Sequence, residues 1–155
     1  MNWKMGLGHW RDRRAPCIRL AKKLGIYEEI IFAGSTGEPE KYYGAADILV
    51  HSTFYDACSL TILEALASGL PVISTVSNGA SGVFNDGQGG FVIRSPRDQG
   101  VLKERITFFF DERKRKEFSL DARICMERFL VEFNYRDMKS LFLKFAENRK
   151  MNDGR

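Results

Sequence analysis

Residues 46–76 read ADILVHSTFYDACSLTILEALASGLPVISTV, and this segment carries the clearest evidence for the fold class. Residues 46–52 form a short apolar run of strand length, and residues 71–76 form a second run that is rich in β-branched side chains. The segment between them is typical of a helix, so the predicted order is strand, loop, helix, strand. Such a βαβ unit requires a parallel sheet and a right-handed crossover.

The helix is predicted from Ser59 to Ser68, because apolar residues recur there at intervals of three and four. Ser59 or Asp56 suits the N-cap position, Gly69 suits the position after the helix, and Pro71 prevents its continuation. The pattern is apolar on most sides, so the helix is expected to be buried. The recurring apolar residues are Leu60, Ile62, Leu63, Leu66 and Ala67.

Glu64 is the only acidic or basic residue between Asp56 and Asp86. An ionised carboxylate is rarely buried unless it is paired or hydrogen-bonded, so a ligand is one reason for its presence in this helix. Ligands of parallel sheets bind outside the carboxyl ends of the strands, where residues 53–58 lie. Asp56 and Glu64 are therefore predicted to belong to one crevice. The structural alternatives are a core-paired carboxylate for Glu64 and a helix cap or Asx turn for Asp56.

The stretch from residue 45 to residue 93 resembles the nucleotide-sugar-binding half of retaining glycosyltransferases of the GT4 family, which have the GT-B fold. That family carries two acidic residues eight positions apart, here Asp56 and Glu64, followed by a small-residue helix and a Gly-x-Pro-Val ending. The resemblance covers roughly residues 28–130, and lipopolysaccharide core glucosyltransferases are among the members it is similar to. In this chain the ending is Gly69, Leu70, Pro71 and Val72.

The resemblance implies a role for each matching residue. Glu64 would accept hydrogen bonds from the ribose hydroxyls of the donor, and Asp56 would face the donor sugar as the catalytic acidic residue. Asn78 and Gly79 would contact the substrate, with plain turn residues as the alternative. Four residues would present backbone N–H groups to the pyrophosphate, a role that the unsatisfied donors and dipole of a helix N-terminus also support. These four are Ala57, Cys58, Ser59 and Leu60.

The chain departs from the family pattern at three places. Asp56 is one methylene shorter than the usual Glu, and residues 77–82 lack the Glu that commonly follows the family's Gly-Gly loop. The family's phosphate-binding Arg and Lys lie on an opening βα unit that this chain is expected to lack. The nearest basic cluster is Arg11, Arg13 and Arg14.

With 155 residues, the chain is about one domain long, whereas a complete GT-B enzyme has two. Residues 1–148 are therefore expected to form a single Rossmann-like domain with helices on both faces of a parallel sheet, followed by a polar tail, 149–155. Two functional readings follow. One is the donor-binding part of an enzyme that transfers a hexose from a UDP-glucose type donor to a glycan or lipid-linked lipopolysaccharide acceptor, with an acceptor-domain partner. The other is a non-catalytic nucleotide-sugar-binding or interaction module.

The net charge is +4, and the densest basic run is residues 113–116. This run fits either contact with anionic phospholipids or a solvated helix face. Nucleic-acid binding is not expected, because aromatic residues do not interleave with the basic run. Three separated cysteines and two histidines suggest no metal site and no cofactor beyond the sugar-nucleotide substrate. With no signal peptide or membrane-span pattern, the chain is expected in the cytoplasm, with a peripheral contact to the inner membrane face as one reading.

The remaining sequence predicts further elements around the βαβ unit. Turn-forming residues separate them, and apolar residues recur at helical or strand intervals within them. The expected helices are residues 16–24, 38–45, 101–110, 118–129 and 136–147, and the expected strands are residues 29–33 and 91–94.

Overall fold

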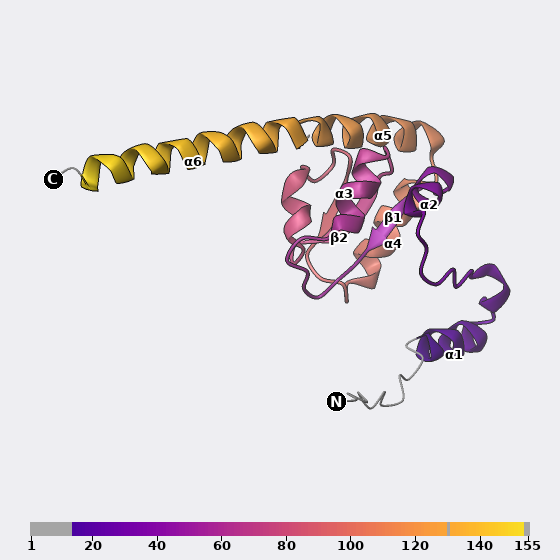
Figure 1. The fold of residues 1–155 in the computed structure, drawn as a ribbon. Coiled ribbons are helices and arrows are strands. Elements are labelled where there is room, and N and C mark those ends of the chain that lie inside the picture. The colour runs from indigo at the N-terminus through magenta and orange to yellow at the C-terminus, as the bar shows by residue number, and fades with distance from the viewer. Residues whose placement is uncertain (1–13, 130, 154–155) are drawn as a thin grey trace, which may run out of the picture. The chain divides into compact units, whose positions relative to one another are not determined.

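The computed structural model describes residues 14–129 and 131–153, and the chain forms two compact units that divide after Gly37 (Figure 1). The first unit contains α1 (Ala15–Leu24) and the 3-10 helix η1 (Tyr27–Glu29). The second unit contains, in chain order, α2 (Pro39–Ala45), β1 (Leu49–His51), α3 (Leu60–Ala67), β2 (Val72–Thr75), η2 (Gly79–Val83), β3 (Gly90–Ile93), α4 (Gln99–Phe108), α5 (Glu112–Glu127) and α6 (Val131–Asp153).

The second unit is built on a parallel three-stranded sheet with the order β1-β2-β3. Ile73 of the central strand is in register with Val50 on one side and with Phe91 on the other. The sequence β1–α3–β2 is the predicted βαβ unit, and each of its strands begins and ends within three residues of the predicted position. The expected α/β class with a parallel sheet is therefore confirmed.

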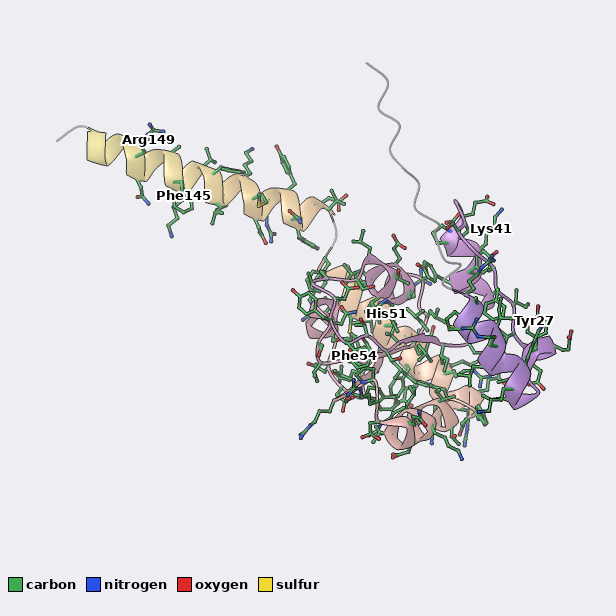
Figure 2. All side chains as sticks on the ribbon, turned by 90° about the horizontal axis from the view of Figure 1, so that it is seen from below. Tyr27, Lys41, His51, Phe54, Phe145 and Arg149 are labelled. Carbon is green, nitrogen blue, oxygen red and sulfur yellow. The ribbon has the colours of Figure 1, made fainter. Side chains whose placement is uncertain are left out.

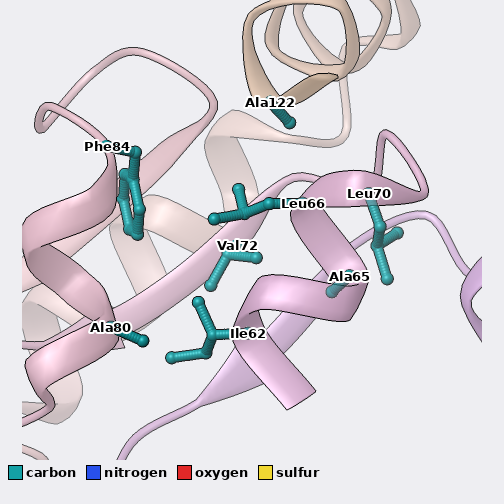
Figure 3. Close-up of a cluster of buried hydrophobic side chains, with 8 residues drawn as sticks. All are labelled: Ile62, Ala65, Leu66, Leu70, Val72, Ala80, Phe84 and Ala122. Carbon is teal, nitrogen blue, oxygen red and sulfur yellow. The ribbon is translucent and has the colours of Figure 1, made fainter. Parts of the chain in front are cut away.

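Successive residues of β2 enter two separate apolar clusters, as the alternation of side chains along a strand requires. Val72 belongs to the cluster beneath α3, which Figure 3 shows with Phe84 and with Ala122 of α5. Ile73 belongs to the second cluster, which contains Phe91, Phe109 and Phe118. Helices thus cover both faces of the sheet. Because α5 supplies Phe118 to one cluster and Ala122 to the other, it joins the two halves of the core.

The predicted ends of α3 are found, but its predicted burial is only partly correct. Ser59 is the N-cap residue, and Gly69 follows the helix with φ 76°, a conformation that favours glycine. Ile62 and Leu66 are fully buried against the sheet. The opposite stripe faces solvent, with Leu60 68% exposed and Glu64 exposed as well. Glu64 is therefore not the buried carboxylate that the apolar pattern predicts.

Two further predictions differ from the structure. Residues 30–33, within the strand predicted at 29–33, form no strand, and Ile31 is 90% exposed. A β-branched run becomes a strand only when a ladder partner is present, and the described sheet consists of β1, β2 and β3 alone. At the other end of the chain, α6 is longer than the helix predicted at residues 136–147, because it runs from Val131 to Asp153. The predicted domain limits, 1–148 and 149–155, stay a prediction.

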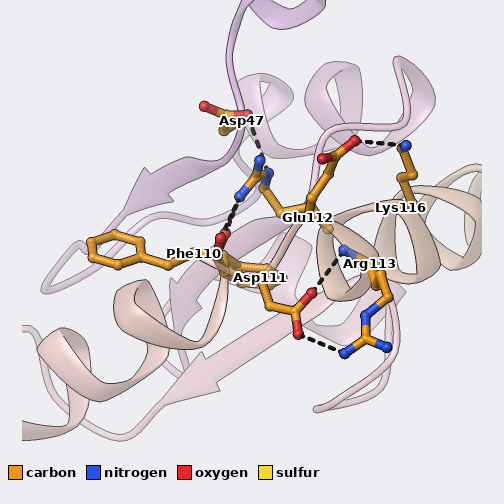
Figure 4. Close-up of polar contacts among 8 residues, drawn as sticks. Asp47, Phe110, Asp111, Glu112, Arg113 and Lys116 are labelled. Atoms are coloured by element: carbon orange, nitrogen blue, oxygen red, sulfur yellow. Dashed lines mark hydrogen bonds and ion pairs between the residues drawn. The ribbon is translucent and has the colours of Figure 1, made fainter.

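The basic run at the start of α5 makes contacts within the chain (Figure 4). Arg113 pairs with Asp111 at 3.6 Å, and Lys116 pairs with Glu112 at 2.6 Å. Arg115 pairs with Asp47 at 3.2 Å and donates to the carbonyl oxygens of residues 109 and 110, which follow α4. Lys114 lies over the ring of Phe108, 4.1 Å from its centroid. Each cation of the run thus has an internal partner, which favours the structural reading over phospholipid contact. Among the described residues, no helix has the length and apolar character that crossing a bilayer requires.

Candidate functional site

Two loops meet at the carboxyl ends of β1 and β2. The N–H of Asp56 donates to the carbonyl oxygen of Ser77 at 3.1 Å, and the N–H of Gly79 donates to the carbonyl oxygen of Asp56 at 2.9 Å. Thr75 Oγ1 also donates to the carbonyl oxygen of Thr53 at 2.7 Å. These bonds bring Asp56, Asn78 and Gly79 together in front of α3, as the sequence predicts for one site.

Asn78 organises this site from within, because its side chain is only 2% exposed. Its Oδ1 accepts the N–H groups of Ala80 at 3.0 Å and of Ser59 at 3.4 Å. Its Nδ2 lies 3.4 Å from Nδ1 of His51. The predicted substrate contact is thus an amide whose atoms already have partners within the protein, and it fixes the start of α3 relative to the loop after β2.

Gly79 is required by close packing of the two loops. A Cβ atom at this position would lie 1.9 Å from the carbonyl oxygen of Ala57, far inside van der Waals contact. The sequence Asn78-Gly79 predicts an ordinary turn. It does not predict the close approach of the two loops, which is what requires a glycine here. Gly79 is here because the loop before α3 passes directly over its Cα atom.

The start of α3 has both satisfied and open donors. Asp56 Oδ1 accepts the N–H of Cys58 at 3.1 Å, an Asx turn, and Asn78 accepts the N–H of Ser59. No acceptor for the N–H groups of Ala57, Leu60 and Thr61 is found in the described part of the chain. Two of the four predicted pyrophosphate donors, the N–H groups of Ala57 and Leu60, are therefore open, which means that they have no acceptor within the described residues. The N–H of Thr61 is open as well. Open donors at a helix N-terminus favour an anion.

Glu64 lies one turn further along α3 and contacts α2. The hydroxyl of Tyr43 donates to Oε2 of Glu64 at 2.9 Å. Burial of Tyr43 raises its pKa above the ordinary value of 10.0, and the hydrogen bond to the carboxylate raises that pKa further. This contact shows that Glu64 can accept a hydroxyl hydrogen bond, which is the chemistry that a ribose would require.

The Tyr43 contact predicts a dependence of stability on pH. Because the pKa of Tyr43 is raised in the folded state, its stabilising contribution is complete below pH 10.0 and is lost as the pH rises through the folded pKa. Tyr43→Phe should therefore remove a tyrosine ionisation that lies above pH 10.0, late in an ultraviolet titration, and should flatten the alkaline loss of unfolding free energy. Tyr42→Phe, at a neighbouring side chain that is 51% exposed, is the control. Loss of the late ionisation in the control instead would contradict this assignment.

The structure adds residues that the sequence does not single out. The guanidinium carbon of Arg97, in the loop after β3, lies 5.2 Å from the ring centroid of Phe54 in the loop after β1. Figure 2 labels Phe54 together with His51, which ends β1. Arg97 is thus a cation at the carboxyl end of the sheet. Arg97 and Phe54 are 43 residues apart in the chain, so no local sequence pattern predicts their contact.

The described residues also form a pocket at the opposite end of the sheet. It has a volume of ≈ 370 Å³ and is lined in part by Tyr43, Asp47, Pro71 and Arg115. These residues lie before β1 and β2 or at the start of α5, whereas ligands of parallel sheets bind at the carboxyl ends of the strands. No group of three or more His, Cys, Asp or Glu side chains that could hold a metal ion is found within the described ranges.

Residues 8–123 match the family model described as "Glycosyl transferases group 1". The sequence is 34% identical over 94 residues to the lipopolysaccharide glucosyltransferase WaaG of Escherichia coli (strain K12), covering 61% of this chain and 25% of that protein. The crystal structure of WaaG is similar with a TM-score of 0.69 at 28% identity, over 74% of this chain and 31% of WaaG. The Anabaena HepE structure in complex with UDP-glucose shares the fold with a TM-score of 0.74 at 22% identity, over 87% of this chain and 38% of HepE. This chain therefore spans about a quarter of the length of the curated WaaG sequence.

Proposed function

Because this chain belongs to the glycosyl transferases group 1 family, we propose that the start of α3 binds the diphosphate of a nucleotide-sugar donor. The observation that carries the proposal is the group of open N–H donors at Ala57, Leu60 and Thr61, at the carboxyl ends of parallel strands. The proposed donor is of the UDP-glucose type, as in the HepE complex.

Two acidic residues have separate proposed roles on either side of the diphosphate. Glu64 is exposed and already accepts a hydroxyl, so it is proposed to bind the ribose hydroxyls of the donor. Asp56 uses Oδ1 to accept the N–H of Cys58 and is proposed to face the donor sugar with its second oxygen. There, the carboxylate would stabilise positive charge that develops on the sugar as the leaving group departs.

The proposed reaction is a retaining transfer of a hexose to a glycan or lipid-linked acceptor, and its catalysis is electrostatic. Negative charge accumulates on the nucleoside diphosphate as the bond to the sugar breaks. Fixed N–H donors at the start of α3 would stabilise that charge without reorganisation. Arg97 is proposed as a nearby counter-charge, because its contact with Phe54 holds it beside the same loop. Acceptor contacts are proposed to come from an acceptor-domain partner.

The test is a calorimetric titration of the chain with UDP, GDP, ADP and UDP-glucose, using the wild type, Glu64→Gln and Glu117→Gln. Glu117 is exposed on α5 and serves as the matched control. We expect one nucleotide to bind, and Glu64→Gln to weaken it at least about tenfold, because the charge is lost and one of the two acceptor oxygens is replaced by an NH2 donor. Equal affinity in the wild type and Glu64→Gln would contradict the ribose role, and no binding of any nucleotide would contradict the donor-site proposal.

A further inference from the structure

Three side chains form a connected network beside the open end of α3. His51 ends β1, Ser59 is the N-cap residue of α3, and Asn78 lies in the loop after β2. Nε2 of His51 is 3.3 Å from Oγ of Ser59, and Nδ1 of His51 is 3.4 Å from Nδ2 of Asn78. Ser59 is 5% exposed and Asn78 is 2% exposed, so water has little access to these two side chains as an alternative hydrogen-bond partner.

The orientation of the Asn78 amide is set by two backbone donors. The N–H groups of Ala80 and Ser59 can only donate, and both point at the same amide atom of Asn78. That atom must therefore be the oxygen, because nitrogen of an amide is a donor. It follows that the atom of Asn78 facing His51 is Nδ2, which donates.

The direction of the remaining hydrogen bonds follows from that orientation. Because Asn78 donates to Nδ1 of His51, Nδ1 must be unprotonated, and the proton of the neutral imidazole lies on Nε2. Nε2–H then donates to Oγ of Ser59, so the Ser59 hydroxyl hydrogen points elsewhere. The Ser59 side chain makes no capping bond to α3, and no acceptor for its hydroxyl is found among the described residues.

We propose that His51, held as its Nε2–H tautomer by Asn78, is a positioning residue that turns the Ser59 hydroxyl into a hydrogen-bond donor for the bound diphosphate. This inference rests on the proposed function of the α3 N-terminus. It adds a side-chain donor to the open N–H groups of Leu60 and Thr61, next in the chain to Ser59. His51 itself touches no substrate and acts through Ser59.

The tautomer is tested directly by long-range ¹H–¹⁵N spectra of the histidine side chains in the nucleotide-free chain. The chain has two histidines, His9 and His51, and His51→Gln identifies the signals that belong to His51. We expect the chemical shifts of a neutral ring with a protonated Nε2. Signals of the Nδ1–H tautomer would overturn the inference without reference to any ligand.

The role at the diphosphate is tested by the affinities of UDP and uridine for single and double variants. Ser59→Ala and His51→Leu should each weaken UDP by about tenfold, since one hydrogen bond to a charged group is lost, and should leave uridine unchanged. The double variant should bind UDP no more weakly than either single variant, because both act on one hydrogen bond. His51→Gln, whose amide can still donate to Ser59, should keep UDP affinity within about threefold. Thermal unfolding checks that each variant is folded.

The outcomes separate this inference from the function on which it rests. No UDP binding to the wild-type chain would overturn the proposed donor site and this role with it. UDP binding that is equal in the wild type and Ser59→Ala would overturn the role of Ser59 and leave the donor site standing. Additive losses in the double variant, or no rescue by His51→Gln, would show that His51 does not act through Ser59.

Discussion

Gly79→Ala is expected to lower the free energy of unfolding by about 3 kcal/mol, at the upper end of what overpacking usually costs. The added Cβ would lie 1.9 Å from the carbonyl oxygen of Ala57, which is backbone and cannot move aside like a flexible side chain. Relief requires the two loops to separate, which would also break the 2.9 Å bond from the Gly79 N–H to Asp56. Urea unfolding of the variant and the wild type measures the loss.

Gly82→Ala is the matched control, because it adds the same methyl group three positions later. Both glycines lie in η2, and a Cβ at position 82 would meet nothing within 4 Å. We expect Gly82→Ala to change the unfolding free energy by less than about 0.5 kcal/mol, as is usual for open surface positions. Similar stabilities of the two variants would show that the loops do not approach each other as described.

Phe109→Ala is expected to cost about 4 kcal/mol of unfolding free energy, since it removes a large buried ring and leaves a cavity. Phe109 is 2% exposed, and its ring centroid lies 5.4 Å from that of Phe91 and 5.1 Å from that of Phe118. These rings form the cluster between β3, α4 and α5. Loss of Phe109 should therefore loosen both helices relative to the sheet.

The adjacent Phe110 provides the control for this experiment. It is 75% exposed, although it stands in the same run of three phenylalanines, TFFFD. Phe110→Ala should change the unfolding free energy by less than about 0.5 kcal/mol. A larger loss for Phe110→Ala than for Phe109→Ala in urea unfolding would reverse the assignment of the buried ring.

These contrasts show which features local sequence can and cannot predict. The β1–α3–β2 unit was predictable because its signals are local: strand-like runs, a helical repeat, and the stop formed by Gly69 and Pro71. Residues 29–33 have the same local signals but are not a strand in the structure. A strand also needs a neighbouring strand to pair with, and the local sequence does not determine such pairing. The exposure of the α3 stripe that contains Glu64 is not predictable in this way, because an apolar pattern does not say which side a sheet will cover.

The sequence predicts that several candidate site residues lie together, and the structure shows how their loops meet, while their functional roles stay predictions. Asp56, Ser59, Asn78 and Gly79 do come together, because the βαβ topology places their loops at one end of the sheet. The internal bonds of Asn78 reach partners 19 and 27 residues away in the chain, and such distances are set by tertiary packing alone. The turn-like sequence Ser-Asn-Gly therefore does not predict the hydrogen bonds by which the Asn78 amide connects the two loops.

The paired bonds between Asp56 and the loop at residues 77–79 also bear on how the site would meet a ligand. The backbones of both loops are already hydrogen-bonded to each other. The conformational entropy of the loops is therefore lost during folding, before any nucleotide binds. Association can then be a single-step encounter with a preformed surface, and a nucleotide should change the amide signals of these loops without a slow closing phase. The same connection makes the two loops one mechanical element, in which a change in one is transmitted to the other.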